Sequence, residues 1–145
     1  MECYLREAII EDIDILCKWA NDPLVRQNSF STEKIRYEDH VKWFNRVLKG
    51  DNYAQYIYMD GENPIGQVHV KIENDVAEIG YSICAEKLRM GYGSDLVSQI
   101  SQEIWKKFPD VTKIIGKVKP ENIASQKTLL DAGYKEMYRV FEIKG

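Results

Sequence analysis

The fold is decided by one stretch of the chain, Ile83-Cys84-Ala85-Glu86-Lys87-Leu88-Arg89-Met90-Gly91-Tyr92-Gly93-Ser94-Asp95-Leu96. A run of strand-forming residues leads into this stretch, and an amphipathic helix follows it. A strand that ends in a glycine turn and opens a helix leaves backbone N–H groups unpaired at the positive end of the helix dipole. Such a turn attracts anions. We therefore expect it to hold a phosphate-bearing cofactor.

The rest of the chain alternates between strand and helix periodicity, which indicates a mixed α/β domain. We expect helices at about 13–20, 37–49, 93–107 and 122–132, an irregular stretch at 24–34, and strands at 4–8, 53–59, 65–73, 76–84, 113–118 and 134–143. Tight turns join the second, third and fourth strands into an antiparallel meander. The strand at 113–118 follows a strand and a helix, so it should lie parallel to 76–84. The last segment is short, and a sheet edge left open there can pair with another chain.

Length and composition narrow the class of protein. With 145 residues and a net charge of −3, the chain is expected to be one domain, 1–145, without a nucleic-acid partner. It has no apolar run of the roughly 20 residues that span a membrane and no signal peptide at its start, so we expect a cytoplasmic protein. Its cysteines, Cys3, Cys17 and Cys84, are odd in number and widely spaced, which favours reduced thiols. No histidine has a partner at metal-ligand spacing, so we expect no metal.

Two motifs together resemble the GNAT superfamily of acetyl-CoA-dependent N-acetyltransferases. The first is the strand end with its turn, Ile83-Cys84-Ala85 and Arg89-Met90-Gly91-Tyr92-Gly93-Ser94. The second is a helix that begins at Asn122-Ile123-Ala124-Ser125 and ends at Asp131-Ala132-Gly133-Tyr134. The resemblance implies a mostly antiparallel central sheet with a splayed parallel strand pair and about four flanking helices. It also implies a bulge in the strand before the turn.

The resemblance further implies an acetyl-CoA site. Pantetheine would pair with the backbone of Ile83, Cys84 and Ala85. Asn122 and Ser125 would contact the pantetheine or phosphate arm of the cofactor from the last helix. The pyrophosphate would rest on the turn, whose residues are Arg89, Met90, Gly91, Tyr92, Gly93 and Ser94.

The chain departs from the family pattern at two positions. Leu88 stands where the family usually has Gln or Arg, so we expect the backbone N–H groups of the turn, and not this side chain, to bind the pyrophosphate. Leu129 stands where the family often has the tyrosine that protonates the departing thiolate. A noncatalytic acyl-CoA-binding module therefore stays open as an alternative to an enzyme.

Acetyl transfer to an amine needs a base, because a protonated amine cannot attack a thioester. Glu78 is the first candidate, with a solvated strand residue as the other interpretation. Tyr81 and Tyr134 are candidate acids, although tyrosines at such positions more often serve packing. His69 is interpreted as a packing residue, and Cys84 as an inert thiol and not a nucleophile.

The acceptor side is expected between Trp19 and Phe44, with Ser29, Phe30, His40 and Trp43 as substrate-binding residues. This region resembles acetyltransferases that act on the 4-amino sugar of a nucleotide-linked sugar, as in pseudaminic-acid-type biosynthesis. That resemblance implies acetyl transfer by direct attack of a primary amine. A protein N-terminus or a polyamine is the alternative acceptor, and either a monomer or a homodimer is compatible with the sequence.

Overall fold

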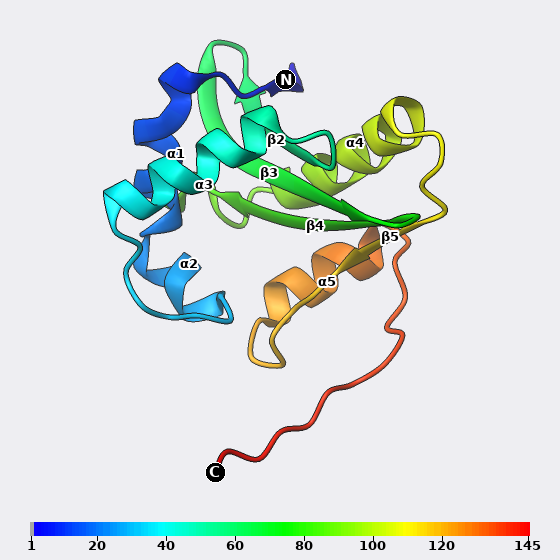
Figure 1. The fold of residues 1–145 in the computed structure, drawn as a ribbon. Helices are drawn as coiled ribbons and strands as arrows, with labels where there is room; N and C mark the ends of the chain where they lie inside the picture. Colours follow the sequence, from blue (N-terminus) through cyan, green and yellow to red (C-terminus); the bar gives the residue numbers. More distant parts are fainter. Residues whose placement is uncertain (1) are drawn as a thin grey trace.

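Five strands form one sheet at the centre of the computed structural model, which describes residues 2–145 (Figure 1). The strands are β1 (Cys3–Glu7), β2 (Tyr53–Asp60), β3 (Asn63–Glu73), β4 (Val76–Ile83) and β5 (Lys113–Gly116). They lie in chain order, antiparallel from β1 to β4 and parallel between β4 and β5. The predicted meander and the predicted parallel strand are confirmed.

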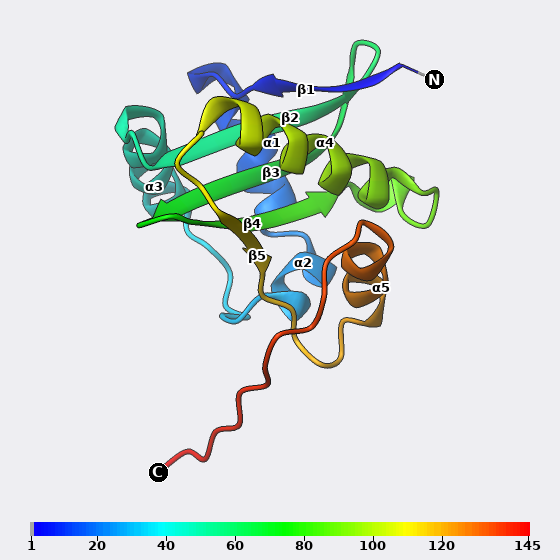
Figure 2. The ribbon, with the colours of Figure 1, turned by 90° about the vertical axis from the view of Figure 1, so that its right-hand side faces the viewer.

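Helices cover both faces of the sheet (Figures 1 and 2). Helices α1 (Ile13–Ala20) and α3 (Tyr37–Lys49) pack on one face, and α4 (Tyr92–Lys107) and α5 (Ile123–Asp131) pack on the other. Side chains alternate along β2, so Tyr56 and Tyr58 join the α4 side while Ile57 and Met59 join the α1 side. Because both faces are covered, this strand is buried along most of its length.

The stretch expected to be irregular contains a further helix, α2 (Pro23–Asn28). Its start is well specified by the sequence. The Asp22 carboxylate accepts hydrogen bonds from Leu24 N (3.0 Å) and Val25 N (3.4 Å), and Pro23 occupies the first turn. The prediction of an irregular stretch was wrong here, because Asp22 and Pro23, which follow the helix predicted at 13–20, also start α2.

The strand predicted at 134–143 is not formed. Gly133 ends α5 with a φ of +94°, and Tyr134 N donates to Leu129 O (3.0 Å). Residues 135–145 then run away from the body of the molecule in an extended path (Figures 1 and 2). A strand needs a neighbouring strand for its hydrogen bonds, and this segment lies beside none among residues 2–145.

Candidate active site

A cavity of about 990 Å³ opens where β4 and β5 separate. The parallel pairing ends at Ile79 and Gly116, while β4 continues alone on that side to Ile83. The cavity is lined from both faces of the sheet, by α2 and α3 on one side and by the starts of α4 and α5 on the other. The predicted splay is confirmed, and it gives the cavity a passage through the sheet.

The backbone of β4 faces this opening without a bulge. The register between β3 and β4 is uninterrupted from Gly66–Ile83 to Glu73–Val76, so the bulge implied by the resemblance is absent. Cys84 N donates to Ile65 O (2.8 Å) on β3. Peptide groups alternate along a strand, so those of Tyr81 and Ile83 point to the open side. The splay alone therefore exposes them.

The turn between β4 and α4 holds the backbone in an unusual conformation. Arg89 has a φ of +64° and Gly91 a φ of +83°, both in the left-handed region. Helix α4 begins directly after Gly91, and no side chain caps its first turn. Gly93 is helical, so Gly91 is the glycine that the turn conformation requires. The unpaired N–H groups at the start of α4 lie beside the cavity, where an anion can accept from them.

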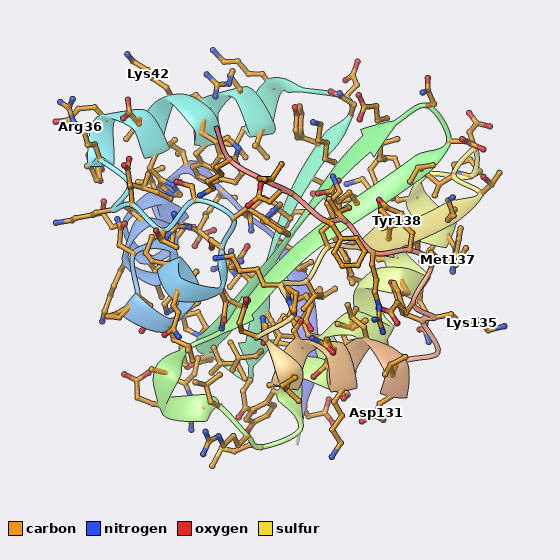
Figure 3. The ribbon with its side chains drawn as sticks, turned by 90° about the horizontal axis from the view of Figure 1, so that it is seen from below. Arg36, Lys42, Asp131, Lys135, Met137 and Tyr138 are labelled. Carbon is orange, nitrogen blue, oxygen red and sulfur yellow. The ribbon has the colours of Figure 1, made fainter. Side chains whose placement is uncertain are left out.

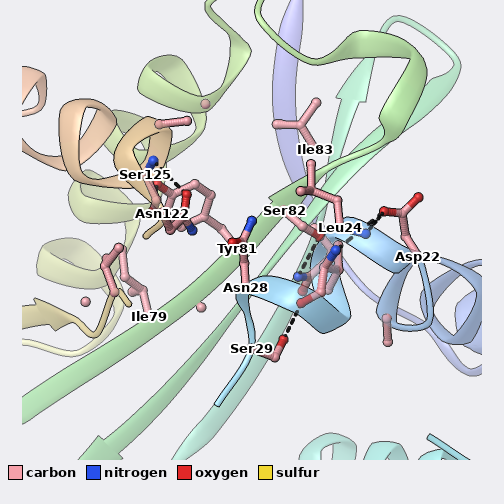
Figure 4. A pocket seen from close by; sticks show the side chains of 18 of the residues that line it. Asp22, Leu24, Asn28, Ser29, Ile79, Tyr81, Ser82, Ile83, Asn122 and Ser125 are labelled. Atoms are coloured by element: carbon pink, nitrogen blue, oxygen red, sulfur yellow. Dashed lines mark hydrogen bonds between the residues drawn. The ribbon is translucent and has the colours of Figure 1, made fainter. Parts of the chain in front are cut away.

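The start of α5 forms the opposite wall (Figure 4). Asn122 Oδ1 accepts from Ser125 N (3.2 Å), which caps the helix as predicted and leaves the Asn122 amide as a donor. Ser125 Oγ and the Tyr81 hydroxyl lie 2.7 Å apart. Burial raises the pKa of Tyr81. Its hydroxyl is therefore protonated at neutral pH.

On the other face of the sheet, three aromatic rings contact one another in the cavity wall. His40 lies on Trp43 (5.6 Å between centroids), and Trp43 meets the edge of His69 (5.8 Å). Burial lowers the pKa of both histidines, so both rings are neutral at pH 7. His69 lies directly over Gly80, where a Cβ atom would come within 2.4 Å of His69 Nε2. Within residues 2–145, the buried His40 Nε2 has no hydrogen-bond partner.

Glu78 lies two residues before Gly80 and lines the cavity. Its carboxylate is 3.1 Å from Lys117 Nζ, which follows β5. The charge of Glu78 also raises the pKa of His69, although burial is the larger effect on that ring and lowers it. Glu78, His69 and Lys117 therefore form one group of interacting side chains at the inner end of the splay.

Most of the predicted site residues lie on this single cavity. Its lining includes Ser29, Phe30, His40, Trp43, Glu78, Tyr81, Ile83, Arg89, Gly91, Tyr92, Gly93, Ser94, Asn122 and Ser125. Among the described residues, the remaining four predicted ones, Cys84, Ala85, Met90 and Tyr134, are not part of the lining. The Tyr134 hydroxyl is instead 2.8 Å from Ser101 Oγ on α4. Ser29 Oγ donates to Val25 O (2.6 Å), so this hydroxyl supports α2.

The sequence analysis interpreted His69 as a packing residue and did not name Thr128, yet both line the cavity. His69 could have been found from the hairpin register, because it pairs with Gly80, and a glycine opposite a large ring often marks a close approach. In residues 2–145, no three His, Cys, Asp or Glu side chains converge as metal ligands. The same residues include no helix that is long and apolar enough to cross a bilayer.

Known proteins share the fold of this chain. A curated relative, the uncharacterized N-acetyltransferase p20 of Bacillus licheniformis, is 27% identical over 140 residues, which are 91% of this chain and 78% of that protein. The aminoglycoside acetyltransferase AAC(6')-Ib, solved with ribostamycin and coenzyme A, has a similar structure, with a TM-score of 0.84, 23% identity, and coverage of 94% of this chain and 85% of that one. The spermidine N-acetyltransferase of Vibrio cholerae, solved with coenzyme A and spermine, gives a TM-score of 0.85 at 19% identity, with 99% and 88% covered.

At these identities the solved structures show the fold alone, whereas the family model is decisive. The model of the acetyltransferase (GNAT) domain matches residues 3–135. The chain therefore belongs to the GNAT family, as an N-acetyltransferase that uses acetyl-CoA.

Proposed function

We propose that this N-acetyltransferase acts on a primary amine of a small cationic molecule, a polyamine or an amino sugar, which attacks acetyl-CoA directly in a ternary complex. The observation that carries the proposal is the single cavity that passes through the sheet between β4 and β5. It joins a wall rich in backbone donors on one face to a wall of aromatic and acidic side chains on the other. Both substrates therefore have room to meet inside the sheet.

The cofactor side suits the phosphates and the pantetheine arm of acetyl-CoA. The uncapped N–H groups of Tyr92, Gly93 and Ser94 would bind the pyrophosphate. The open peptide groups of Tyr81 and Ile83 would pair with the amides of pantetheine. When bound, acetyl-CoA supplies the activated acetyl group as a thioester.

Tyr81 is the proposed proton donor to the leaving sulfur. Its hydroxyl is protonated and lies 2.7 Å from Ser125 Oγ on α5. Ser125 is one helical turn before Leu129, the position where the family often has a tyrosine. Tyr81 on β4 therefore places a hydroxyl beside α5, the helix that has Leu129 in place of the family's tyrosine.

Glu78 and His69 are the proposed route for the proton that leaves the amine. The acetyl group would lie beside Ser82, between the open peptide groups of Tyr81 and Ile83. At about 3.3 Å per residue, Glu78 stands roughly 13 Å along β4 from Ser82, so it would act through water. His69 pairs with Gly80, half that distance away, and its ring is neutral. A neutral imidazole accepts a proton, and the nearby Glu78 carboxylate stabilises the resulting cation.

The charges on the acceptor side favour a cationic substrate. Asp22, Asp39 and Glu78 line it, although Lys117 lies 3.1 Å from Glu78 and balances that charge. Arg26 also lines it, but its guanidinium donates to the carbonyls of Ala20 (2.7 Å), Ser31 (3.1 Å) and Glu33 (3.2 Å). Of the two solved structures compared above, one contains the aminoglycoside ribostamycin and the other contains spermine. A polycationic amine fits this surface better than a nucleotide diphosphate does.

The nucleotide-linked 4-amino sugar suggested by the sequence is the second candidate acceptor. Phe30 favours it, because this side chain is 70% exposed and lies on the cavity, where it can stack on a base. A protein N-terminus is a further alternative within the family.

The test measures release of coenzyme A with a panel of amines: spermidine, an aminoglycoside, a nucleotide-linked 4-amino sugar and a peptide with a free N-terminus. We expect kcat/KM for spermidine or the aminoglycoside to exceed that for the other two at least tenfold. Turnover of the nucleotide-linked sugar alone would select the second candidate. Tight acetyl-CoA binding without turnover of any amine would instead indicate a noncatalytic acyl-CoA-binding module.

A matched pair of variants tests the charge argument. Asp39→Asn should raise the KM for a cationic amine severalfold and leave the KM for acetyl-CoA unchanged, because Asp39 lines the acceptor side. The adjacent Glu38→Gln is the control, since Glu38 pairs weakly with Arg36 (3.7 Å) and lies outside the cavity lining among the described residues. Equal effects of the two substitutions would contradict a specific role for Asp39.

A further inference from the structure

A row of polar side chains crosses the centre of the sheet on the face that α3 covers. The row consists of Gln55 on β2, Gln67 and His69 on β3, and Ser82 on β4. Figure 3 shows this arrangement of layers, with α3, marked by Arg36 and Lys42, on one side of the sheet and α5, marked by Asp131, on the other. The next positions of β2 on the same face are the apolar Ile57 and Met59. Polar side chains in such a place need hydrogen-bond partners, because burying them without partners costs free energy.

The hydrogen bonds of Gln55 fix the orientation of two amides. Gln55 is 5% exposed, and its Nε2 lies 3.1 Å from Val68 O and 3.3 Å from Tyr56 O. Carbonyl oxygens only accept, so the atom that faces them must be the amide nitrogen. The same nitrogen is 2.8 Å from Gln67, so the Gln67 atom there must be the oxygen, Oε1. The nitrogen of Gln67 then points the other way and donates to Ser82 Oγ (3.1 Å).

This orientation of Gln67 determines which nitrogen of His69 carries the proton. Gln67 Oε1 lies 3.5 Å from His69 Nδ1, and this contact is a hydrogen bond only if Nδ1 is the protonated nitrogen. Burial lowers the pKa of His69, so the neutral ring has one proton and its Nε2 has a free lone pair. Nε2 lies over Gly80, which lines the cavity together with His69. The nitrogen on the side of the reaction is therefore a proton acceptor.

The other end of the row is the Ser82 hydroxyl, which lines the cavity (Figure 4). Among residues 2–145, Ser82 Oγ has one hydrogen bond, which it accepts from Gln67. Its own hydrogen is therefore left for a ligand. Ser82 stands between Tyr81 and Ile83, whose peptide groups face the splay, so a thioester held there would lie beside this hydroxyl. A donor at that place stabilises the negative charge that develops on the thioester oxygen during attack.

We propose that the Gln55–Gln67 amide pair is a positioning device that sets the direction of the hydrogen bonds at both reacting groups. It keeps the proton of His69 on Nδ1, so that Nε2 can accept from the amine, and it leaves the Ser82 hydrogen free for the thioester oxygen. The inference rests on the proposed proton route through His69.

The protons and electrons of the transfer balance with these roles. As the N–C bond forms, one proton moves from the amine nitrogen to His69 Nε2. The electron pair of the C–S bond leaves with the sulfur, which takes the proton of Tyr81. The ring then holds a proton on each nitrogen and returns the one on Nε2 to water near Glu78, and Tyr81 regains a proton from water. With the proton on Nε2 at the start, the ring would donate to the amine and could not take its proton.

Nuclear magnetic resonance of the protein with ¹⁵N-labelled histidine tests the tautomer directly. The chain has two histidines, so the spectrum of His40→Asn contains His69 alone. Two-bond ¹H–¹⁵N correlations distinguish a protonated ring nitrogen from a bare one. At neutral pH we expect His69 in the native chain to have a protonated Nδ1 and a bare Nε2. A proton on Nε2, alone or together with one on Nδ1, would overturn the proposal.

Gln67→Met tests the amide pair, because methionine has a similar length and cannot accept from Nδ1 or donate to Ser82. The single-tautomer pattern of His69 should be lost, while the signals of His40 in the same spectra should not change. The kcat should fall about two- to tenfold, the range in which a hydrogen bond between neutral groups shifts a population, with the KM for acetyl-CoA kept within threefold. Gln99→Met is the matched control, since it also removes an amide with two hydrogen bonds, to Cys3 O (3.0 Å) and Asp95 (2.8 Å), outside the cavity lining.

Ser82→Ala tests the other end of the row and does not depend on whether Gln67→Met folds. It should lower kcat at least tenfold and leave the tautomer of His69 unchanged. An unchanged kcat in Ser82→Ala, or an unchanged tautomer pattern in a folded Gln67→Met, would overturn the proposal.

His69→Asn distinguishes a failure of this inference from a failure of the proposed proton route. Full kcat in His69→Asn would overturn the route and, with it, the catalytic role of the amide pair. A large loss of kcat in His69→Asn, combined with a proton on Nε2 in the native chain, would overturn the amide pair alone and leave the route in place.

Discussion

The substitution Gly93→Ala should weaken coenzyme A binding without lowering the stability of the fold, so it separates the two properties. Gly93 is in the first turn of α4 and does not have a positive φ. An added Cβ would lie 3.5 Å from Thr128 Cγ2 and 3.6 Å from Thr128 Oγ1, which is ordinary contact. Alanine in a helix is favoured over glycine by roughly 0.5–1 kcal/mol. The free energy of unfolding should therefore stay equal or rise by up to about this amount.

The same methyl group stands on the cavity wall, because Gly93 and Thr128 both line the cavity. If the pyrophosphate accepts from Gly93 N–H, the methyl displaces it and weakens at least one hydrogen bond to a charged group. Such a bond contributes about 1.5–3 kcal/mol, so the Kd for coenzyme A should rise roughly ten- to hundredfold. Calorimetric titration with coenzyme A and urea unfolding on one preparation measure both quantities.

Gly61→Ala is the matched control. Gly61 has a φ of +60° in the β2–β3 turn, and a Cβ there would meet no atom within 4 Å. The left-handed backbone should cost about 1–2 kcal/mol of stability, with the affinity for coenzyme A unchanged. An unaltered affinity in Gly93→Ala would refute the assignment of the α4 turn to the pyrophosphate.

Three further predictions follow from other contacts. Tyr81→Phe should lower kcat about a hundredfold with acetyl-CoA affinity kept within threefold, and an unchanged kcat would exclude Tyr81 as the acid. Glu78→Gln should lower the rate chiefly at low pH, whereas His69→Asn should lower it across the pH range; an unchanged pH–rate profile in both variants would remove the proposed proton route. Burial lowers the pKa of His40 and of His69 in the folded chain, so around and below pH 6.5 the unfolded chain binds more protons than the folded chain does. The free energy of unfolding should therefore fall as the pH is lowered from 7.5 to 5.5. Urea titrations at several pH values measure this dependence, which should be weaker in His40→Asn and in His69→Asn.

The sequence predicted the cofactor side of the fold well, because the features that build it are local. The positive φ of Gly91, the Asn122 cap and the Gly133 helix end each depend on a few adjacent residues. The strand order followed from turn lengths and from the handedness of one crossover. The start of α2 is equally local, because Asp22 and Pro23 specify it, but the same two residues also follow the end of α1 and so can be interpreted as a helix end alone.

The acceptor side was less predictable because it is assembled from distant segments. Trp43 reaches His69 only when α3 packs across β3, and no local pattern specifies that contact. Residues 134–143 differ again, since they have a strand-like pattern but pair with no strand among residues 2–145. Propensity identifies a strand, whereas pairing depends on what lies alongside it.

The two sides of the cavity differ in what they are made of, and this difference separates their functions. The cofactor wall offers peptide groups of β4 and of the α4 turn, which substitutions rarely remove, whereas the acceptor wall includes side chains from α2, α3 and β3. Changes on the acceptor wall can therefore alter the amine that is accepted and leave acetyl-CoA binding intact. The Glu78–Lys117 pair is where the two walls and the free edge of β5 meet. Substitutions at this pair would act on the proposed proton route without removing a contact to the cofactor, so they should change kcat more than the KM for acetyl-CoA.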